Sequence, residues 1–422
     1  MVRPVHIGLS PNTGGGDALS AFKLLLQPWK WRNGSSIVEI EEWLKDYFRA
    51  QTALTFNAGR SALLILLKSL ELPKNSEVLI QAFTCAAVPN SIRWAGLTPV
   101  FVDIGKTLNV DTADAEKKIT PQTKVLIVQH TFGIPADMEK IASFSQRHNL
   151  ILIEDCAHAL GAAYKGRLVG TFGDAAFFSF GRDKIVSSVF GGAVILTQNS
   201  RPKSDQPWAG KLKNYQEKLS YPSYFWILQQ LLHPIISFVV LYTYNFLNLG
   251  KAILWLAQKL RLLSFPVYTQ EKSGRQPSVF PKKYPNALAE LLISQLKQLT
   301  EFNHVRIAHA QLFYDLLSKR LIIPKPQSGA VYLRYNLLTK YADEIRFYLK
   351  KQGIIAGNWY SHLIDPKGSD AEHAGYVWGS CPNAEKAARE SLNLPTYPYI
   401  TEKQIRQIGK LINQLYDAKT DH

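Results

Sequence analysis

The spacing of apolar and polar residues divides the first half of this chain into short strands that alternate with amphipathic helices. Between residues 36 and 50, apolar side chains recur every three or four positions, which predicts a helix. Apolar runs of strand length and segments of helical period then succeed each other. The predicted strands cover 53–56, 78–80, 99–103, 125–129, 151–153 and 175–180, and the predicted helices cover 62–70, 86–95, 113–119 and 138–148. This alternation predicts an α/β fold in which helices cover both faces of a mostly parallel sheet.

The C-terminal third has a mixed pattern. A long helical segment begins near Leu288, and strand-like pieces follow at 329–337 and 353–359, with helices predicted over 342–351 and 402–416. We therefore expect a large domain of residues 1–287 and a smaller α+β domain of residues 288–422.

Composition narrows the class of protein and its surroundings. The chain has 422 residues, of which 46% are hydrophobic, so it can build two domains around substantial cores. Its net charge of +16 would suit nucleic acid, an anionic membrane or a phosphorylated substrate. We expect no nucleic-acid partner, because the sequence has no zinc-finger spacing and no long Lys/Arg block. We also expect no metal ion.

The cysteines and the first residues bear on the cellular location. Cys85, Cys156 and Cys381 are scattered and odd in number, which favours a reducing compartment over a disulfide framework. The N-terminal stretch lacks the continuous apolar core of a secretory signal. Both features predict a cytoplasmic protein.

Candidate chemistry gathers between residues 151 and 195. The strand 151–153 ends on Glu154 and Asp155, and the strand 175–180 ends near Ser179, five residues before Lys184. Open α/β sheets place their ligands at the C-terminal ends of parallel strands. Upstream, the strand 53–56 is followed by a glycine turn and a helix. Free N–H groups at such a helix start can hold a phosphate, although ordinary strand-to-helix turns have the same pattern.

These residues resemble the DegT/DnrJ/EryC1/StrS sugar aminotransferases, which are fold-type I pyridoxal phosphate (PLP) enzymes. The resemblance extends from about Trp29 to Tyr416 and is interrupted by one long insertion. The family pattern is met by Glu154, Asp155, Ala157, His158, Ser179, Phe180, Lys184, Gly191 and Gly192. The resemblance implies a fold-type I PLP-dependent transferase, a homodimer, and a small domain that covers the substrate.

The resemblance and the chemistry of PLP assign two central roles. Asp155 would face the pyridine nitrogen and keep it protonated, because a carboxylate raises the pKa of a neighbouring pyridinium. Lys184 would bind the cofactor aldehyde covalently and later carry the proton to and from the substrate carbon. Some relatives have His in place of this lysine and act as dehydratases, so Lys184 favours transamination.

Other cofactor contacts follow from the same resemblance. Gly59, Arg60 and Ser61 occupy the phosphate turn, where Arg60 replaces the usual Thr and would either contact the phosphate or be solvated. Ser179 would bind the phosphate or cap the following loop. His158 would lie near the phenolic oxygen of the cofactor or pack between sheet and helix.

Several positions depart from the family pattern or remain open. Cys85 stands where the family often has an aromatic residue that stacks on the PLP ring, so Phe83 or His158 would supply that contact. An Asn that reaches the phosphate of the other subunit is replaced by Lys283 in the ungapped match, with Asn286 three residues away. Candidate substrate contacts are Tyr360 and His362. Two further polar residues, His130 and Asp137, are read as a structural histidine at a strand end and a helix-start residue.

The insertion, residues 201–275, is apolar and basic. Residues 223–250 contain no Asp, Glu, Lys or Arg, and a basic amphipathic stretch follows at 251–263. The length approaches the ~20 residues that span a bilayer. A single span would place the two halves of one sheet domain on opposite sides of a membrane.

We therefore expect a re-entrant helical pair, helices that lie at a membrane surface, or a hairpin packed against a dimer partner or over the active site. Lysines on both flanks and several Tyr and Trp residues favour a peripheral or monotopic arrangement at the inner face of the membrane, through residues 221–263. Deleting that stretch should then make the enzyme soluble with PLP binding retained.

Together these features predict a PLP-dependent aminotransferase that converts a keto-sugar linked to a nucleotide diphosphate into an amino-sugar, with glutamate as amino donor by family resemblance. The pathway would be cell-surface glycan or secondary-metabolite biosynthesis. The alternative is a membrane-associated, catalytically inactive PLP-fold protein with a binding or scaffolding role.

Overall fold

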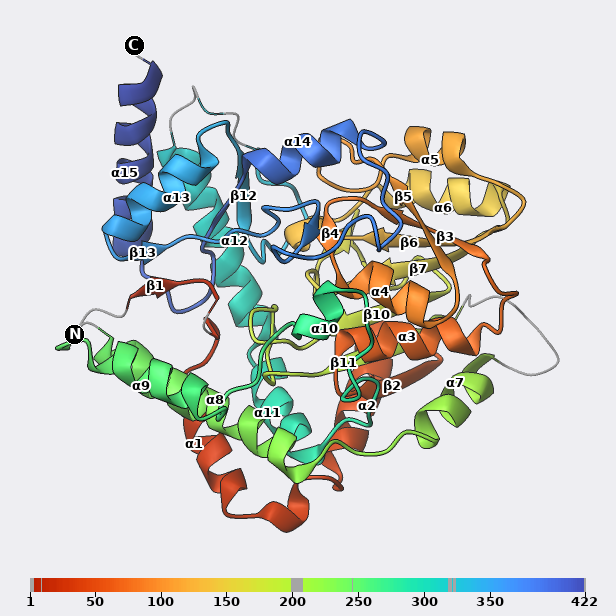
Figure 1. Cartoon of the computed structure of the whole chain (residues 1–422), viewed down its shortest axis with the longest axis horizontal. Coiled ribbons are helices and arrows are strands. Elements are labelled where there is room, and N and C mark those ends of the chain that lie inside the picture. Colours follow the sequence, from red (N-terminus) through yellow and green to blue (C-terminus); the bar gives the residue numbers. More distant parts are fainter. Residues whose placement is uncertain are drawn as a thin grey trace.

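A seven-stranded sheet organises the computed structural model, which describes residues 4–8, 10–198, 208–244, 246–317, 321 and 324–420 (Figure 1). The strand order is β2-β11-β10-β7-β6-β3-β5. The strands are β2 (Thr52–Phe56), β3 (Glu77–Gln81), β5 (Thr98–Val102), β6 (Thr123–Gln129), β7 (Ile151–Asp155), β10 (Ala175–Ser179) and β11 (Gly192–Leu196). β11 is antiparallel to both of its neighbours, and the other pairs are parallel. The predicted α/β fold with a mostly parallel sheet is confirmed.

Helices pack on both faces of this sheet because side chains along a strand alternate in direction. In β3, Val78 and Ile80 belong to one apolar cluster and Leu79 belongs to another, which includes Ile141. The helices of this part are α1 (Gly15–Leu25), α2 (Ser36–Phe48), α3 (Gly59–Ser69), α4 (Ala87–Trp94), α5 (Thr112–Lys118) and α6 (Met138–Arg147). Short strands β4 (Thr84–Cys85), β8 (Ala163–Tyr164) and β9 (Arg167–Leu168) lie in the connections.

The C-terminal part surrounds its own apolar cluster, which includes Phe313, Leu337, Ile345 and Ile408. The helical segment predicted from Leu288 is two helices, α11 (Asn286–Leu296) and α12 (Leu299–Leu316). The following elements are β12 (Tyr335–Leu338), α13 (Ala342–Lys351), β13 (Ile354–Ile355), β14 (Ile364–Asp365), α14 (Pro382–Glu390), β15 (Ser391–Leu394) and α15 (Glu402–Thr420). β1 (Val5–His6) pairs with β13, so the N-terminal segment joins this part as well. The boundary at residues 287/288 stays a prediction.

The predicted strand over 329–337 is wrong in its first half. Gly329 and Tyr332 have φ values of +79° and +47°, which extended strands do not adopt. Only the end of the segment pairs, as β12 with β15. The predicted strand over 353–359 is likewise reduced to the two residues of β13.

The insertion is helical, as expected. Its helices are α7 (Trp208–Glu217), α8 (Tyr224–Thr243), α9 (Leu249–Lys259) and α10 (Thr269–Lys272). Among the described residues, α8 is the one helix long and apolar enough to cross a membrane, and half of it is buried. It packs against α1, α9 and α11, with Trp226, Ile227 and Leu231 in the first apolar cluster. Figure 1 shows α8 and α9 beside α1 at one corner of the molecule.

Candidate active site

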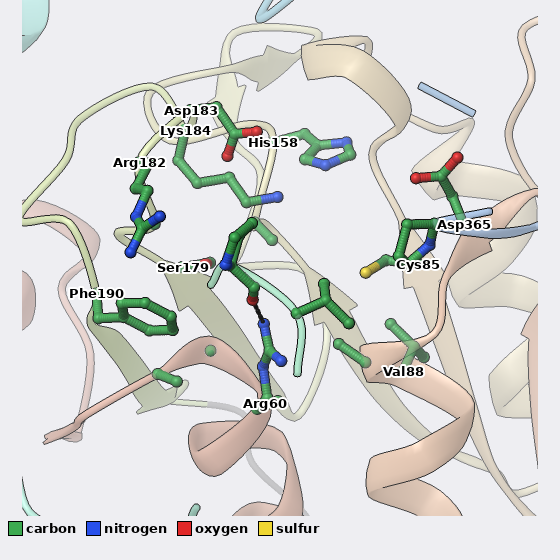
Figure 2. A pocket seen from close by; sticks show the side chains of 18 of the residues that line it. Arg60, Cys85, Val88, His158, Ser179, Arg182, Asp183, Lys184, Phe190 and Asp365 are labelled. Carbon is green, nitrogen blue, oxygen red and sulfur yellow. Dashed lines mark hydrogen bonds between the residues drawn. The ribbon is translucent and has the colours of Figure 1, made fainter. Parts of the chain in front are cut away.

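A cavity of about 350 Å³ lies at the C-terminal ends of the central strands (Figure 2). Its wall is formed by the ends of strands β7 and β10, the start of α3, the loop after β10 and the tail of the insertion. The predicted site residues that line it are Gly59, Arg60, Cys85, Asp155, His158, Ser179, Lys184 and Tyr360. The fold therefore gathers most of the predicted site in one place.

Asp155 ends β7 and lines the cavity with only 4% of its surface exposed. Its Oδ1 accepts a hydrogen bond from the Ala157 amide at 2.9 Å. Burial raises the pKa of this carboxyl to about 6, against the opposing effects of the Ala157 amide and of Lys184. A cationic ring nitrogen beside Asp155 would stabilise the carboxylate and offset its desolvation.

Lys184 enters the same cavity from the loop after β10. Figure 2 shows its side chain extending inward, with His158 and Ser179 nearby. Its Nζ lies 4.7 Å from the centre of the Trp359 ring, a residue that the sequence reading missed. Burial lowers the pKa of the Lys184 ammonium, although Asp183, Cys85 and Asp155 oppose this. A lysine with a lowered pKa is the form that attacks an aldehyde.

The backbone around Lys184 is held by residues distant in sequence. The Asn12 side-chain amide donates to the carbonyl oxygens of Lys184 at 2.6 Å and of Ile185 at 2.9 Å. Arg306, which is fully buried on α12, donates to Asn12 Oδ1 at 2.6 Å. No sequence signal connected these two residues with the lysine loop.

The start of α3 forms a cradle with the ends of β10 and β11. α3 begins at Gly59, three residues earlier than predicted, and its N-cap residue is Ala58, which has no side chain that could accept from the first turn. A Cβ on Gly59 would lie 2.8 Å from Ser179 Cβ, so glycine permits this close approach. Amide groups at a helix start together with the Ser179 hydroxyl suit a phosphate.

Ser61 lies in the same turn, but its hydroxyl does not line the cavity. It is fully buried and donates to Asn57 Oδ1 at 2.8 Å. The hydroxyl of Ser61 is thus engaged within the turn, and the role of Ser61 in cofactor binding stays a prediction.

Arg60 was expected either to contact the phosphate or to be solvated, and the structure rules out the second alternative. Its guanidinium forms an ion pair with Glu271 in α10, donates to the Pro266 carbonyl at 2.8 Å, and lies 4.8 Å from the centre of the Phe280 ring. Arg60 thus fastens the tail of the insertion to the start of α3. Its contact with a phosphate stays a prediction.

His158 and Cys85 line the cavity, whereas Phe83 does not. Phe83 is fully buried and meets the Tyr360 ring edge-on at 5.2 Å, so its predicted contact with a cofactor ring is wrong. The His158 ring stacks on Trp359 at 5.5 Å and accepts a hydrogen bond from the Phe132 amide. Burial holds the pKa of His158 well below its usual range, so this ring is neutral at pH 7.

The loop that contains Tyr360 supplies further wall residues. Tyr360 lines the cavity, but His362 does not, because it turns toward the Ser361 hydroxyl, 3.0 Å from its Nδ1. Asp365, which was not predicted, lines the cavity with 5% of its surface exposed. Among the described residues, its Oδ2 has no hydrogen-bond partner. Asp365 lies three residues beyond the predicted His362, outside the residues chosen from the resemblance.

Neither candidate for the inter-subunit contact lines the cavity of its own chain. Asn286 is buried at the start of α11, where it accepts from the Ser36 amide at 3.1 Å and donates to Lys30 O and Glu290. These intrachain contacts engage both polar atoms of its side chain, and its contact with another subunit stays a prediction. Lys283 is half-buried with its ammonium 5.7 Å from the centre of the Tyr221 ring, and its role stays a prediction.

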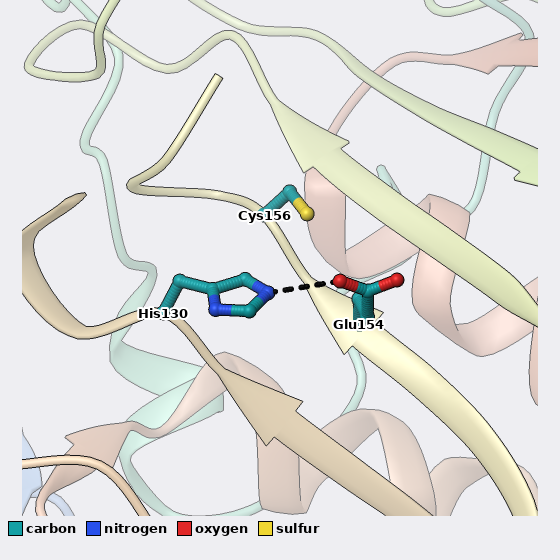
Figure 3. A group of neighbouring side chains, drawn as sticks. All are labelled: His130, Glu154 and Cys156. Carbon is teal, nitrogen blue, oxygen red and sulfur yellow. Dashed lines mark hydrogen bonds and ion pairs between the residues drawn. The ribbon is translucent and has the colours of Figure 1, made fainter. Parts of the chain in front are cut away.

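Glu154 and His130 lie behind the site and are structural (Figure 3). His130 Nε2 is 3.1 Å from Glu154 Oε2, and Cys156 lies next to the pair. The Glu154 carboxylate also accepts from the amides of Gly170, Phe172 and Gly173 at 2.7–2.8 Å. These contacts fix the loop before β10. Asp137 is the N-cap residue of α6, as predicted.

The residues present fit PLP. Three features form the donor set that a pyridinium aldehyde phosphate requires. They are a buried carboxylate that has no salt bridge among the described residues, a lysine with a lowered pKa, and a cradle of helix amides with a serine hydroxyl. Asp155 would hold the ring nitrogen of PLP and Lys184 its aldehyde carbon. The turn at Gly59, together with Ser179, would hold its phosphate.

Fold and site together define a fold-type I PLP-dependent transferase. The chain belongs to the DegT/DnrJ/EryC1/StrS aminotransferase family, which it matches over residues 13–204 and 256–413. It is therefore a PLP-dependent aminotransferase. The unmatched residues between these two ranges contain α7, α8 and most of α9.

Named relatives and a solved structure are similar to the chain over most of its length. The chain is 29% identical over 390 residues to a pleiotropic regulatory protein of Geobacillus stearothermophilus, covering 91% of this chain and 90% of that one. It is 26% identical over 416 residues to GDP-perosamine synthase of Escherichia coli O157:H7, covering 97% and 98%. The crystal structure of NtdA from Bacillus subtilis with bound cofactor PMP superposes with a TM-score of 0.70 at 20% identity, covering 99% of this chain and 86% of that one.

Proposed function

We propose that this enzyme transfers an amino group from an amino acid to the ketone of a sugar linked to a nucleotide diphosphate. The presence of Asp155 and Lys184 in one cavity carries this proposal. Bound PLP supplies an electron sink for the carbon that loses or gains the proton. Lys184 moves that proton at its Nζ, and Asp155 keeps a positive charge at the far end of the ring.

Both half-reactions use these residues in turn. Bound PLP would carry the nitrogen between the amino donor, which departs as a keto acid, and the keto-sugar. In both half-reactions the free amine of Lys184 would accept a proton from one carbon and return it to another. The stack of His158 on Trp359 excludes water from one side of this path.

The charges around the cavity support an anionic acceptor. Arg182 and Lys272 line it, and Lys184 supplies the central amine. Guanidinium and ammonium groups are the usual partners of a diphosphate. The relative named GDP-perosamine synthase supports a nucleotide-linked sugar as acceptor. Glutamate is the proposed donor, and glycan or secondary-metabolite biosynthesis is the proposed setting.

We further propose that the enzyme is a cytoplasmic homodimer that works at the inner face of a membrane. In this arrangement Lys283 reaches the phosphate bound by the other subunit. The scattered free cysteines support a reducing compartment.

The test begins with the purified full-length protein and PLP. We expect a visible absorption band from the bond between Lys184 and the cofactor, which glutamate should discharge. Lys184→Ala should lose the band and lower the transfer rate by about 10⁴-fold or more. Transfer is measured as the mass of the amino-sugar formed from a nucleotide-linked keto-sugar.

Lys272→Ala is the matched control, because this lysine lines the same cavity but is not expected to bind the cofactor. It should keep the band and weaken binding of the nucleotide-linked acceptor. A protein that binds PLP without transferring nitrogen to any keto-sugar would instead be the inactive scaffold.

A further inference from the structure

Large apolar side chains are exposed mainly in one region of the described structure. Three helices, α1, α8 and α9, together with the residues that directly follow each of them, carry most of them. They include Phe22 at 52%, Tyr242 at 50%, Trp255 at 60% and Leu256 at 49% exposure on the helices, and Leu247 at 85% between α8 and α9. The helices pack side by side, α1 on α8 and α8 on α9 (Figure 1). We call this region the three-helix face. An exposed apolar patch of this kind marks an interaction surface.

The exposed charges on the three helices and the residues just after α9 are basic. Residues 221–263 contain no Asp or Glu, whereas Lys251, Lys259 and Arg261 are all exposed. On α1, Lys23 is exposed as well. Basic side chains beside exposed Trp, Tyr and Leu are the composition of helices that bind anionic lipid headgroups.

We propose that the three-helix face docks on the surface of an anionic phospholipid bilayer. The helices lie in the interface with their aromatic side chains at the depth of the headgroups. α1 belongs to this surface although it lies far from the insertion in sequence. The docking does not depend on the proposed aminotransferase activity.

A second copy of the chain fits this face less well. A two-fold interface places the same patch against itself, so the basic groups at Lys251, Lys259 and Arg261 would meet their own copies with no acid in residues 221–263 to pair with them. An anionic bilayer supplies the opposite charge.

Crossing the bilayer is also disfavoured by the packing of α8. Trp226, Ile227 and Leu231 are buried against the protein, and the buried Gln230 accepts a hydrogen bond from Ser264 at 2.7 Å. These contacts would have to break for α8 to leave the protein. The helix therefore contacts lipid along one side only.

The segment that follows α9 connects the three-helix face to the cavity. The Gln229 side chain donates to the Arg261 carbonyl at 2.7 Å, and Ser264 accepts from Arg182 of the cavity wall at 2.5 Å. The next residue, Phe265, is 63% exposed and lines the cavity. Docking would thus bring the mouth of the active site next to the headgroups.

The test is co-sedimentation of the full-length protein with vesicles. We expect binding to vesicles of phosphatidylcholine with phosphatidylglycerol, little binding to phosphatidylcholine alone, and loss of binding as salt rises. Lys251→Glu with Lys259→Glu should lower the partition coefficient at least about thirtyfold, since each basic residue near an anionic surface is worth about fivefold. Trp255→Glu should lower it about tenfold.

Trp378→Glu is the matched control, because Trp378 is 59% exposed but lies outside the three-helix face. It should bind vesicles like the unchanged protein. Both tryptophans are surface residues, so neither change should alter the thermal midpoint noticeably. Equal binding by the Trp255 and Trp378 variants would overturn the proposal. So would a protein that ignores anionic vesicles, or one in which Trp255→Glu abolishes a dimer instead.

Discussion

At the scale of single residues, the buried carboxyl of Asp365 makes the stability of the folded protein depend on pH. Burial, with a smaller effect from Asp183, raises the pKa of its carboxyl to about 7, against the opposing effects of the Ser361 backbone and of Lys272. The native state therefore holds a proton that the unfolded chain has already lost above its ordinary pKa near 3.8. Because the native state binds more protons in this window, stability falls as pH rises from about 4 to 7.

Asp365→Asn should remove the loss of stability that occurs as the pH rises. We expect the gain in thermal stability over the unchanged protein to grow between pH 5 and pH 7 and to level off above, reaching no more than about 2 kcal/mol because the cavity admits water. Thermal unfolding without substrate at a series of pH values measures it. Asp46→Asn, at an exposed position on α2, is the control and should leave the pH profile as it was. A constant difference between Asp365→Asn and the unchanged protein at all pH values would contradict the prediction.

The positions and directions of single side chains also explain which site residues could be predicted from the sequence. Asp155 and Lys184 follow buried strands of strong apolar character, so their place at the sheet edge is readable. Glu154 and Asp155 look equivalent in sequence, but neighbouring strand residues point to opposite faces. The register with β10 turns Asp155 into the cavity and Glu154 toward the loop amides. The sequence could not show that Phe83 lies outside the cavity, because the direction of its side chain depends on packing with Tyr360, far away in sequence.

At the scale of elements, the close contact between β11 and the start of α3 shapes the proposed phosphate cradle. A Cβ on Gly192 would lie 2.4 Å from the Gly59 nitrogen and 2.5 Å from Ala58 C. All of these are backbone atoms, so the start of α3 would have to move.

Gly192→Ala should therefore weaken PLP binding at least about tenfold and lower stability by about 1–3 kcal/mol. Titration of the apoprotein with PLP and a thermal melt measure the two effects. Gly210→Ala in α7 is the control: a Cβ there would meet nothing within 4 Å, so helix propensity should stabilise that variant slightly. If Gly192→Ala binds PLP normally, the cradle lies elsewhere.

Elements with strong local signals were predictable, and those set by distant partners were not. The α13 boundaries match the prediction because acidic residues begin and lysines end a clear helical period. β14 pairs with β4, about 280 residues earlier, and neither strand has a signal of its own. Arg306 and Asn12 likewise act on Lys184 through contacts that only the assembled fold creates.

At the scale of the whole molecule, the insertion is part of the core as well as a surface. The sequence predicted its apolar helices but could not show which side of each is buried. α8 places Trp226, Ile227 and Leu231 among residues of α1 and α11. The tail of the insertion meets Arg60 through Glu271 of α10. The insertion therefore completes both an apolar cluster and one wall of the cavity.

The expectation that residues 221–263 can be deleted with PLP binding retained is accordingly revised. Each buried Trp, Ile or Leu side chain contributes about 1.5–3 kcal/mol, so removing three of them alone costs a large part of the 5–15 kcal/mol that stabilises a typical domain. We expect the deletion to lower the soluble yield, the thermal midpoint and the PLP content together. Trp255→Glu, which changes the exposed side of α9 only, should keep all three. A soluble deletion variant that binds PLP normally would mean that α8 is an appendage, and α1 and α11 would then have to form a stable core without it.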